Sequence, residues 1–139
     1  MSLNDEVEAL KRIKLFSAIE PAKLKLLAFA SERISFEAGQ SLFREGDPGD
    51  AAYLVLEGVA DVVVQSSKGP ITVAEIGRDA FVGEIAILCD VPRTASVTAA
   101  SRIVALRIRK DVFLQLLRDM TSMALEIMRE LAERLEATT

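Results

Sequence analysis

The sequence contains no histidine and only one cysteine, Cys89, among its 139 residues. Without histidine there is no support for a metal site or for a histidine-based catalytic triad. A single cysteine also excludes an internal disulfide. Cys89 directly follows an apolar run, which is typical of a small buried or half-buried side chain rather than of a reactive thiol. We therefore expect no bound metal and no enzymatic activity. A hydrolytic enzyme would need a metal cluster or a histidine that acts as a base, and the chain has no histidine.

Long apolar runs are missing as well. None approaches the ~20 residues that a membrane-spanning helix requires. The first six residues are acidic and lack the apolar segment of a signal peptide, so we expect a cytoplasmic protein that makes no membrane contact. The start Met1-Ser2-Leu3 leaves two readings open: a natural beginning, or a remnant of an expression vector on a piece of a longer protein.

An excess of positive charge is also missing, since the formal net charge is −4, although this value leaves a local basic patch open. This balance argues against broad nucleic-acid binding, because contacts with phosphates need grouped lysines and arginines. Half of the residues are hydrophobic and 27% are charged, as in a globular protein. A chain of this length can bury one sizeable core, so we expect a single domain spanning residues 1–139.

Three patterns follow one another along this domain. Residues 1–32 and 110–139 have helical spacing of their apolar side chains, whereas residues 33–109 alternate with a period of two and are punctuated by glycines. Short strands are expected at Ile34–Phe36, Ser41–Phe43, Ala52–Glu57, Val59–Gln65, Ile71–Ile76, Ala80–Val82, Ala95–Ala100 and Ile103–Arg109. Many short strands at regular spacing favour an antiparallel sandwich or barrel, in which we expect the glycines to shape turns and not to bind.

The terminal segments carry amphipathic helices. Pro21 is expected in the first turn of a helix, where its missing N–H costs nothing. Near the C-terminus an apolar stripe recurs at helical spacing, and it is wide enough for both the barrel and a partner helix. The stripe consists of Met120, Ala124, Ile127, Leu131 and Leu135. We expect a weak homodimer through this helix; packing of the stripe on the barrel is the alternative.

The most informative stretch runs from Phe81 to Val97. It reads Phe-Val-Gly-Glu-Ile-Ala-Ile-Leu at residues 81–88 and Pro-Arg-Thr-Ala-Ser-Val at residues 92–97. Gly83 permits close approach of the backbone at an expected helix start, where free N–H groups attract an anion. Arg93 offers a planar, permanently charged fork for phosphate oxygens. Glu84 would repel phosphate, so we expect it to accept hydrogen bonds from a sugar hydroxyl. Together these residues suit a cyclic sugar phosphate.

This stretch resembles the phosphate-binding cassette of the cyclic nucleotide-binding domain family, which includes the bacterial catabolite activator, protein kinase A regulatory subunits and cyclic-nucleotide-gated channels. The resemblance covers residues 16–139. It implies an eight-stranded antiparallel β-roll with helices at the N-terminus and two further helices at the C-terminus. It also implies that Glu84 binds the ribose 2′-hydroxyl and that Arg93 binds the cyclic phosphate.

The resemblance implies further ligand contacts. The backbone of Gly83, Glu84, Ile85 and Ala86 would face the phosphate, with Thr94 and Ala95 beside it. Val62, Val73 and Val82 would line the ribose and purine, although ordinary core valines explain these positions equally well. Thr138, near the end of the last helix, falls where relatives touch the adenine; a frayed helix end is the alternative. Thr94 leaves selectivity undecided, with cAMP favoured and cGMP open.

The resemblance thus implies a sensor that binds a cyclic nucleotide and transmits a movement of its last helix to a partner or attached effector. The alternative is a degenerate relative that binds another anion or another protein, or a fragment that regulates a larger enzyme or transporter. Within the 139 residues we find no helix-turn-helix after the last helix, no second cassette and no kinase docking segment.

Overall fold

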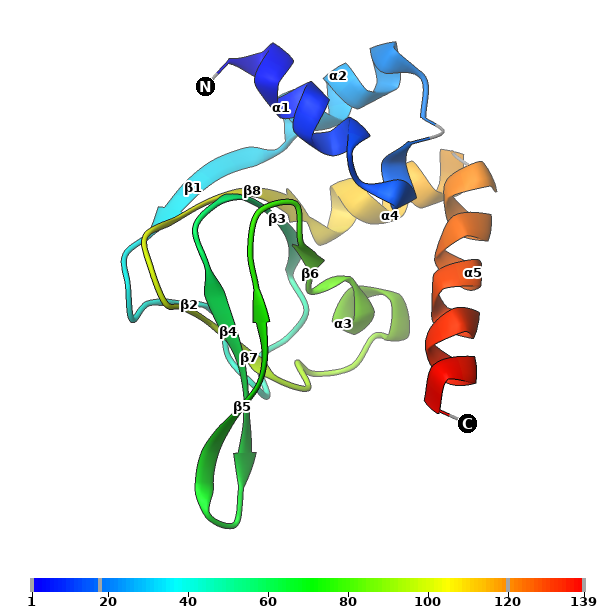
Figure 1. Cartoon of the computed structure of the whole chain (residues 1–139). Helices are drawn as coiled ribbons and strands as arrows, with labels where there is room; N and C mark the ends of the chain where they lie inside the picture. The colour runs from blue at the N-terminus through cyan, green and yellow to red at the C-terminus, as the bar shows by residue number, and fades with distance from the viewer. Residues whose placement is uncertain (1, 18, 120, 139) are drawn as a thin grey trace. The chain divides into compact units, whose positions relative to one another are not determined.

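The computed structural model describes residues 2–17, 19–119 and 121–138; for residues 121–123 and 138 it describes the backbone alone. The chain forms two compact units, one made of residues 1–30 and 111–139 and the other of residues 31–110. Figure 1 shows the helices of the first unit and the strands of the second. The sequence-based prediction of one domain over residues 1–139 stays a prediction.

The first unit is helical. It contains α1 (Leu3–Lys11), the short 3₁₀ helix η1 (Lys14–Phe16), α2 (Pro21–Ala30), most of α4 (Lys110–Asp119) and α5 (Thr121–Thr138). A capping box starts α1: the Ser2 hydroxyl accepts from the Asp5 N–H, and the Asp5 carboxylate accepts from the Ser2 N–H. Pro21 occupies the first position of α2, as the sequence predicts. Among the residues that the structure describes, no helix is long and apolar enough to cross a bilayer.

The second unit contains eight antiparallel strands in two four-stranded sheets. The strands are β1 (Glu32–Phe36), β2 (Ser41–Phe43), β3 (Ala51–Glu57), β4 (Ala60–Ser66), β5 (Gly69–Ile76), β6 (Phe81–Val82), β7 (Ser96–Ala99) and β8 (Ile103–Arg109). One sheet has the order β1-β8-β3-β6 and the other β2-β7-β4-β5. The predicted β-roll is therefore confirmed, with two sheets that do not close into a barrel.

The core of this unit lies between the two sheets. Buried side chains from both sheets form one cluster: Leu42, Ala51, Tyr53, Val55, Ala60, Val97, Ala99, Ile103 and Ala105. Tyr53 contacts two aromatic rings, those of Phe36 and Phe43, with centroid separations of 6.1 and 6.0 Å. Because these aromatic residues come from β1, β2 and β3, which belong to different sheets, their contacts join the two sheets. The short helix α3 (Glu84–Cys89) packs on β3.

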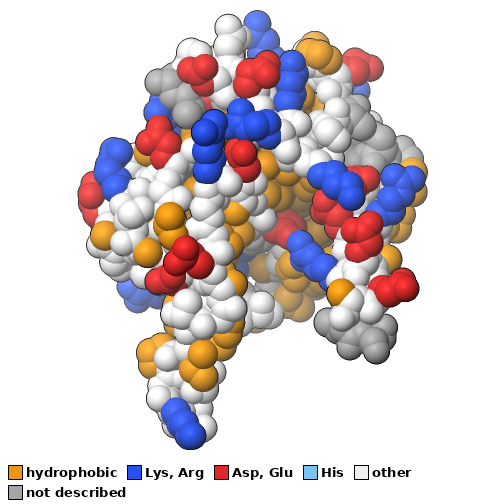
Figure 2. Space-filling view, viewed as in Figure 1, with side chains coloured by type: hydrophobic (Ala, Val, Ile, Leu, Met, Phe, Trp, Pro, Cys, Tyr) orange, Lys and Arg blue, Asp and Glu red, His pale blue; other side chains and the backbone are white. Residues whose placement is uncertain are grey.

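The hairpin of β4 and β5 projects from the rest of the second unit (Figure 1) and carries exposed apolar side chains (Figure 2), Ile71 and Val73 among them. Val62 pairs with Ala74 while Val63 pairs with Thr72, so Val73 is an extra residue that bulges out of β5. Pro70, near the start of this edge strand, has no N–H to donate. A proline and a bulge both discourage pairing of a free edge with another strand.

Candidate ligand site around Arg93

Arg93 is held inside the second unit, with 3% of its surface exposed, and it is the one charged side chain that is buried among the residues described. Its backbone is fixed by the turn between β2 and β3: the Arg93 N–H donates to Asp47 O at 2.8 Å, and the Gly46 N–H donates to Arg93 O at 2.8 Å. The sequence separates these segments by more than forty residues, so the position of Arg93 depends on the folded β-roll.

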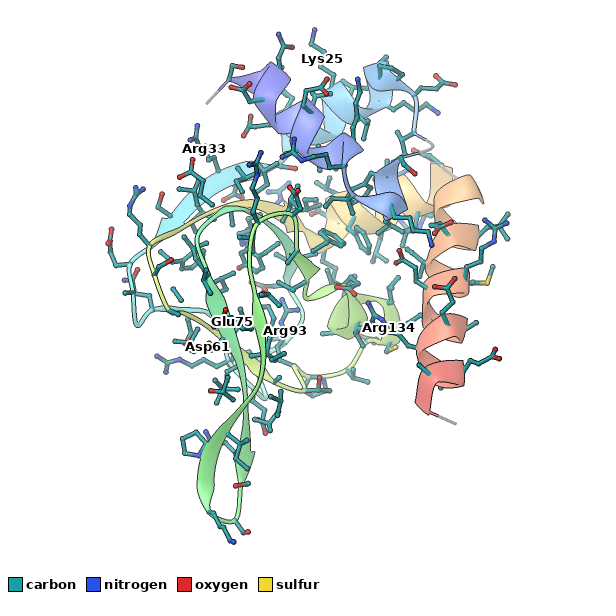
Figure 3. All side chains as sticks on the ribbon, in the orientation of Figure 1. Lys25, Arg33, Asp61, Glu75, Arg93 and Arg134 are labelled. Atoms are coloured by element: carbon teal, nitrogen blue, oxygen red, sulfur yellow. The ribbon has the colours of Figure 1, made fainter. Side chains whose placement is uncertain are left out.

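The guanidinium of Arg93 (Figure 3) donates to two backbone carbonyls: Nη1 to Gly83 O at 2.6 Å and Nη2 to Ala51 O at 2.5 Å. Nη2 also lies 3.4 Å from Oδ1 of Asp50. The Nε atom is buried and has no acceptor within the part of the chain that the structure describes. A buried guanidinium nitrogen without a partner is costly, and a bound anion would satisfy it.

The surroundings of this guanidinium keep water away from its charge. The carbon atom at its centre lies 4.0 Å from the centroid of the Phe43 ring, an arrangement in which cation and ring attract each other. Burial lowers the pKa of Arg93, while the negative charge of Asp50 opposes the shift. An arginine side chain nevertheless remains charged in proteins. The site therefore presents a desolvated positive charge. An anion is attracted to such a charge more strongly than to an arginine that is exposed to solvent.

Gly83 lies against this guanidinium at the start of α3. Its φ of 91° is in the left-handed region, and a Cβ placed there would lie 2.8 Å from Nη1 of Arg93. A side chain at this position would thus meet both backbone strain and a steric conflict with the arginine. The requirement for glycine that the sequence predicts is consistent with both facts.

Gly49 has a role that the sequence reading missed. We expected it to serve turn geometry, but its φ is not positive, and the reason for glycine is close packing. A Cβ on Gly49 would lie 2.6 Å from the Cβ of Ala86 and 2.9 Å from the Ala86 carbonyl carbon. Glycine at this position therefore lets α3 lie directly on the loop that precedes β3.

A row of apolar side chains crosses the second sheet from the arginine outward. Phe43 pairs with Val97, Val97 with Val62, and Val62 with Ala74. Directly paired residues on adjacent antiparallel strands point to the same side of a sheet. Because Phe43 also carries the Arg93 guanidinium, the row forms an apolar floor that begins at the buried charge.

The other predicted site residues differ in how far they are exposed to solvent. Val82, Glu84, Ile85 and Ala95 are half-buried, Ala86 is buried and Thr94 is exposed. Val62 and Val82 pack against the core cluster, whereas Val73 is 57% exposed on the bulge of β5. The side chain of Thr138 lies outside the described residues, as does Met120 of the expected dimer stripe.

Sequence reasoning missed several groups that contact the arginine. Asp50 ends the stretch Glu45-Gly46-Asp47-Pro48-Gly49-Asp50, whose glycines and proline indicate a turn, and the Ala51 carbonyl directly follows it. The aromatic contact with Phe43 was also not predicted. One expectation was wrong: Cys89 is exposed and not buried or half-buried. It is the last residue of α3, and the Asp90 that follows has a left-handed backbone conformation that ends the helix.

The chain belongs to the cyclic nucleotide-binding domain family, whose model matches residues 33–120. It is 36% identical over 108 residues to the cAMP-dependent protein kinase regulatory subunit of Aspergillus niger, covering 78% of this chain and 26% of the fungal protein. It is 28% identical over 132 residues to a CRP-like cAMP-activated global transcriptional regulator of Mycobacterium tuberculosis, covering 94% of this chain and 59% of that protein.

The fold also matches solved structures. A cyclic nucleotide-binding-like protein from Brucella abortus superimposes with a TM-score of 0.73 at 32% sequence identity, over 82% of this chain and 98% of the other.

The chain spans about a quarter of the length of the fungal relative and 59% of the mycobacterial one. What those whole proteins regulate is therefore a separate question from what this domain binds.

Proposed function

We propose that this chain is a regulatory module that binds a cyclic nucleotide and is not an enzyme. The observation that carries the proposal is the Arg93 guanidinium, which is buried at 3% exposure next to Gly83 and retains one nitrogen, Nε, without a partner among the described residues. A desolvated arginine with a free donor suits a singly charged phosphate diester. The matching family model supports the ligand class.

In this proposal the apolar floor receives the nucleoside. Val62 on β4 and Val82 on β6 pack against the core, and we assign them to the ribose and purine. The half-buried Glu84, at the first position of α3, receives the ribose 2′-hydroxyl. The exposed Thr94 is next to Arg93 and can donate to a phosphate oxygen. We favour cAMP over cGMP because both curated relatives named above carry cAMP in their names.

We also propose that binding changes the position of α5 and that an effector, attached or separate, responds to this change. A cytoplasmic location is part of the proposal.

The proposal also includes a weak homodimer through α5. We assign its contacts to the exposed apolar side chains of α5, namely Leu125, Met128 and Leu135, while Ile127 of the predicted stripe is buried. Sedimentation equilibrium at high protein concentration tests the dimer: a monomer with and without ligand would exclude it.

Calorimetric titration with cAMP and with cGMP tests the binding function. We expect micromolar or tighter binding of cAMP, about −8 kcal/mol at a Kd of 1 μM. The Arg93→Leu variant is the matched control, since it removes the charge at the centre of the site. The proposal fails if the folded wild-type chain gives neither heat nor a thermal shift with millimolar cAMP or cGMP.

A further inference from the structure

The carboxylate of Asp50 lies between two arginines. Its Oδ1 is 3.4 Å from Nη2 of Arg93, and its Oδ2 is 3.0 Å from Nη2 of Arg107. The backbone of Asp50 is fixed separately, because its carbonyl accepts a 2.8 Å hydrogen bond from the Lys110 N–H. The position of the Asp50 backbone is therefore set independently of its carboxylate, whose shorter contact is with Arg107.

Arg107 is well anchored on β8. The strand register places it opposite Glu32 of β1 on one side and opposite Tyr53 of β3 on the other. Its Nη1 lies 3.3 Å from Oε1 of Glu32, and its side chain is only 20% exposed. Burial by itself lowers the pKa of Arg107, but hydrogen bonds with Tyr53 and Asp50 and the negative charge of Asp50 raise it overall. The arginine is thus a fixed positive charge next to Asp50.

Asp50 and an incoming phosphate compete for the same cation. Both are anions, and both interact with Arg93, so the carboxylate repels the ligand and occupies part of the guanidinium. Asp50 is 61% exposed, which means that solvent weakens this repulsion but does not remove it. A second arginine that neutralises the carboxylate and holds it at a distance would favour the ligand.

We infer that Arg107 is a positioning residue for cyclic-nucleotide binding, which draws the Asp50 carboxylate away from Arg93 and offsets its negative charge. This inference rests on the proposed function. Without Arg107, the carboxylate would keep Arg93 as its only arginine partner among the described contacts and would move onto Nη2. The ligand would then meet a more occupied guanidinium and an uncompensated carboxylate.

The test is a double-mutant cycle measured by calorimetric titration with cAMP. We expect Arg107→Leu to weaken cAMP binding by about two- to fivefold, the range of partly exposed ion pairs, and Arg107→Lys to lie closer to the wild type. In an Asp50→Asn background, Arg107→Leu should change the affinity no further. The loss in the wild-type background should also shrink as the NaCl concentration rises from about 0.05 to about 0.5 M, as screening of a charge effect requires.

Glu32→Gln is the matched control, because it removes the other carboxylate that pairs with Arg107 and leaves Asp50 untouched. Its cAMP affinity should equal that of the wild type, whatever happens to its unfolding temperature measured without ligand. Arg107→Gln, which is neutral but keeps a polar end group, replaces Arg107→Leu in the cycle if the leucine variant does not fold.

Two results would overturn the inference while leaving the proposed function intact. One is wild-type affinity in both neutral Arg107 variants. The other is an equal loss of affinity in the wild-type and the Asp50→Asn backgrounds, which would mark a purely structural effect. If the folded wild-type chain binds neither cAMP nor cGMP, the proposed function and the role of Arg107 fail together.

Discussion

The carbonyl oxygen of Gly83 accepts a hydrogen bond of 2.6 Å from Nη1 of Arg93, and this contact joins the two halves of the motif. One half starts the helix α3, and the other follows the turn after it. The same guanidinium also reaches the Ala51 carbonyl on β3, so a single side chain ties the cassette to the β-roll. A ligand that binds Arg93 would act on both elements at once.

Replacing Arg93 should therefore impair ligand binding. We expect Arg93→Leu to cost at least about 1.5–3 kcal/mol of binding free energy, the range for hydrogen bonds to charged groups. Arg93→Lys should recover only part of this, because an ammonium lacks the planar fork. Calorimetric titration measures both. Wild-type affinity in both folded variants would place the ligand elsewhere.

Alanine substitutions of Gly83 and Gly39 separate two effects: backbone strain at a positive φ, and a steric conflict of the added Cβ with Arg93. Both have positive φ, 91° and 92°, but a Cβ at Gly83 would lie 2.8 Å from Arg93 Nη1, whereas one at Gly39 would meet nothing within 4 Å. Each alanine substitution should cost about 1–2 kcal/mol of stability for the left-handed backbone. Only Gly83→Ala should also weaken cAMP binding. Chemical denaturation and titration of both variants give the comparison, and equal affinities would contradict it.

Glu84 is expected to recognise the ribose. Glu84→Gln should reduce the preference for cAMP over 2′-deoxy-cAMP by about 1 kcal/mol or more, since the hydrogen bond from the 2′-hydroxyl would lose its charged acceptor. Affinity for the deoxy ligand itself should change little. Competition titrations with the two nucleotides measure the ratio, and an unchanged ratio would remove Glu84 from the ribose site.

Asp61 and Glu75 stand opposite each other on β4 and β5 (Figure 3). Two like charges directly across an antiparallel pair repel each other. Glu75→Lys should therefore stabilise the chain by about 0.2–1 kcal/mol, with the gain decreasing at high salt. Glu133→Lys changes the net charge equally at an exposed position of α5 and serves as the control. Thermal unfolding of the two variants should differ in this direction; equal stabilities would show that the cross-strand repulsion is negligible.

Hydrogen exchange tests whether the effect of ligand binding reaches helices outside the motif at residues 81–97. cAMP should slow the exchange of amides at residues 83–88, where the phosphate contact is expected, and also in α5 if binding changes the position of that helix. Arg93→Leu at the same cAMP concentration gives the baseline. Protection limited to residues 83–88 would describe a module that binds without signalling through α5.

Local sequence patterns account for the elements of this fold. Alternating apolar residues and glycine-rich turns predicted all eight strands, with β2 and β8 at their observed bounds and the others displaced by one or two residues at one or both ends. Pro21 marked the start of α2 because a proline fits only the first turn of a helix. These signals depend on neighbours along the chain, and so a single sequence is sufficient to read them. The motif at residues 81–97 likewise indicated Gly83 and Arg93, which the structure brings into contact.

The side chains around Arg93 come from distant parts of the chain, and only the folded structure brings them together. Phe43 and Asp50 lie more than forty residues before it, and no local pattern distinguishes them from an ordinary strand residue and an ordinary turn residue. Gly49 has the sequence context of a turn glycine, but its close contact is with α3, through Ala86. Arg107 acquires its contact with Asp50 from the pairing of β8 with β3. The local motif indicates which residue carries the charge. The pairing of distant strands sets how deeply that charge is buried and which groups compete for it, because burial and pairing arise only when the sheets come together.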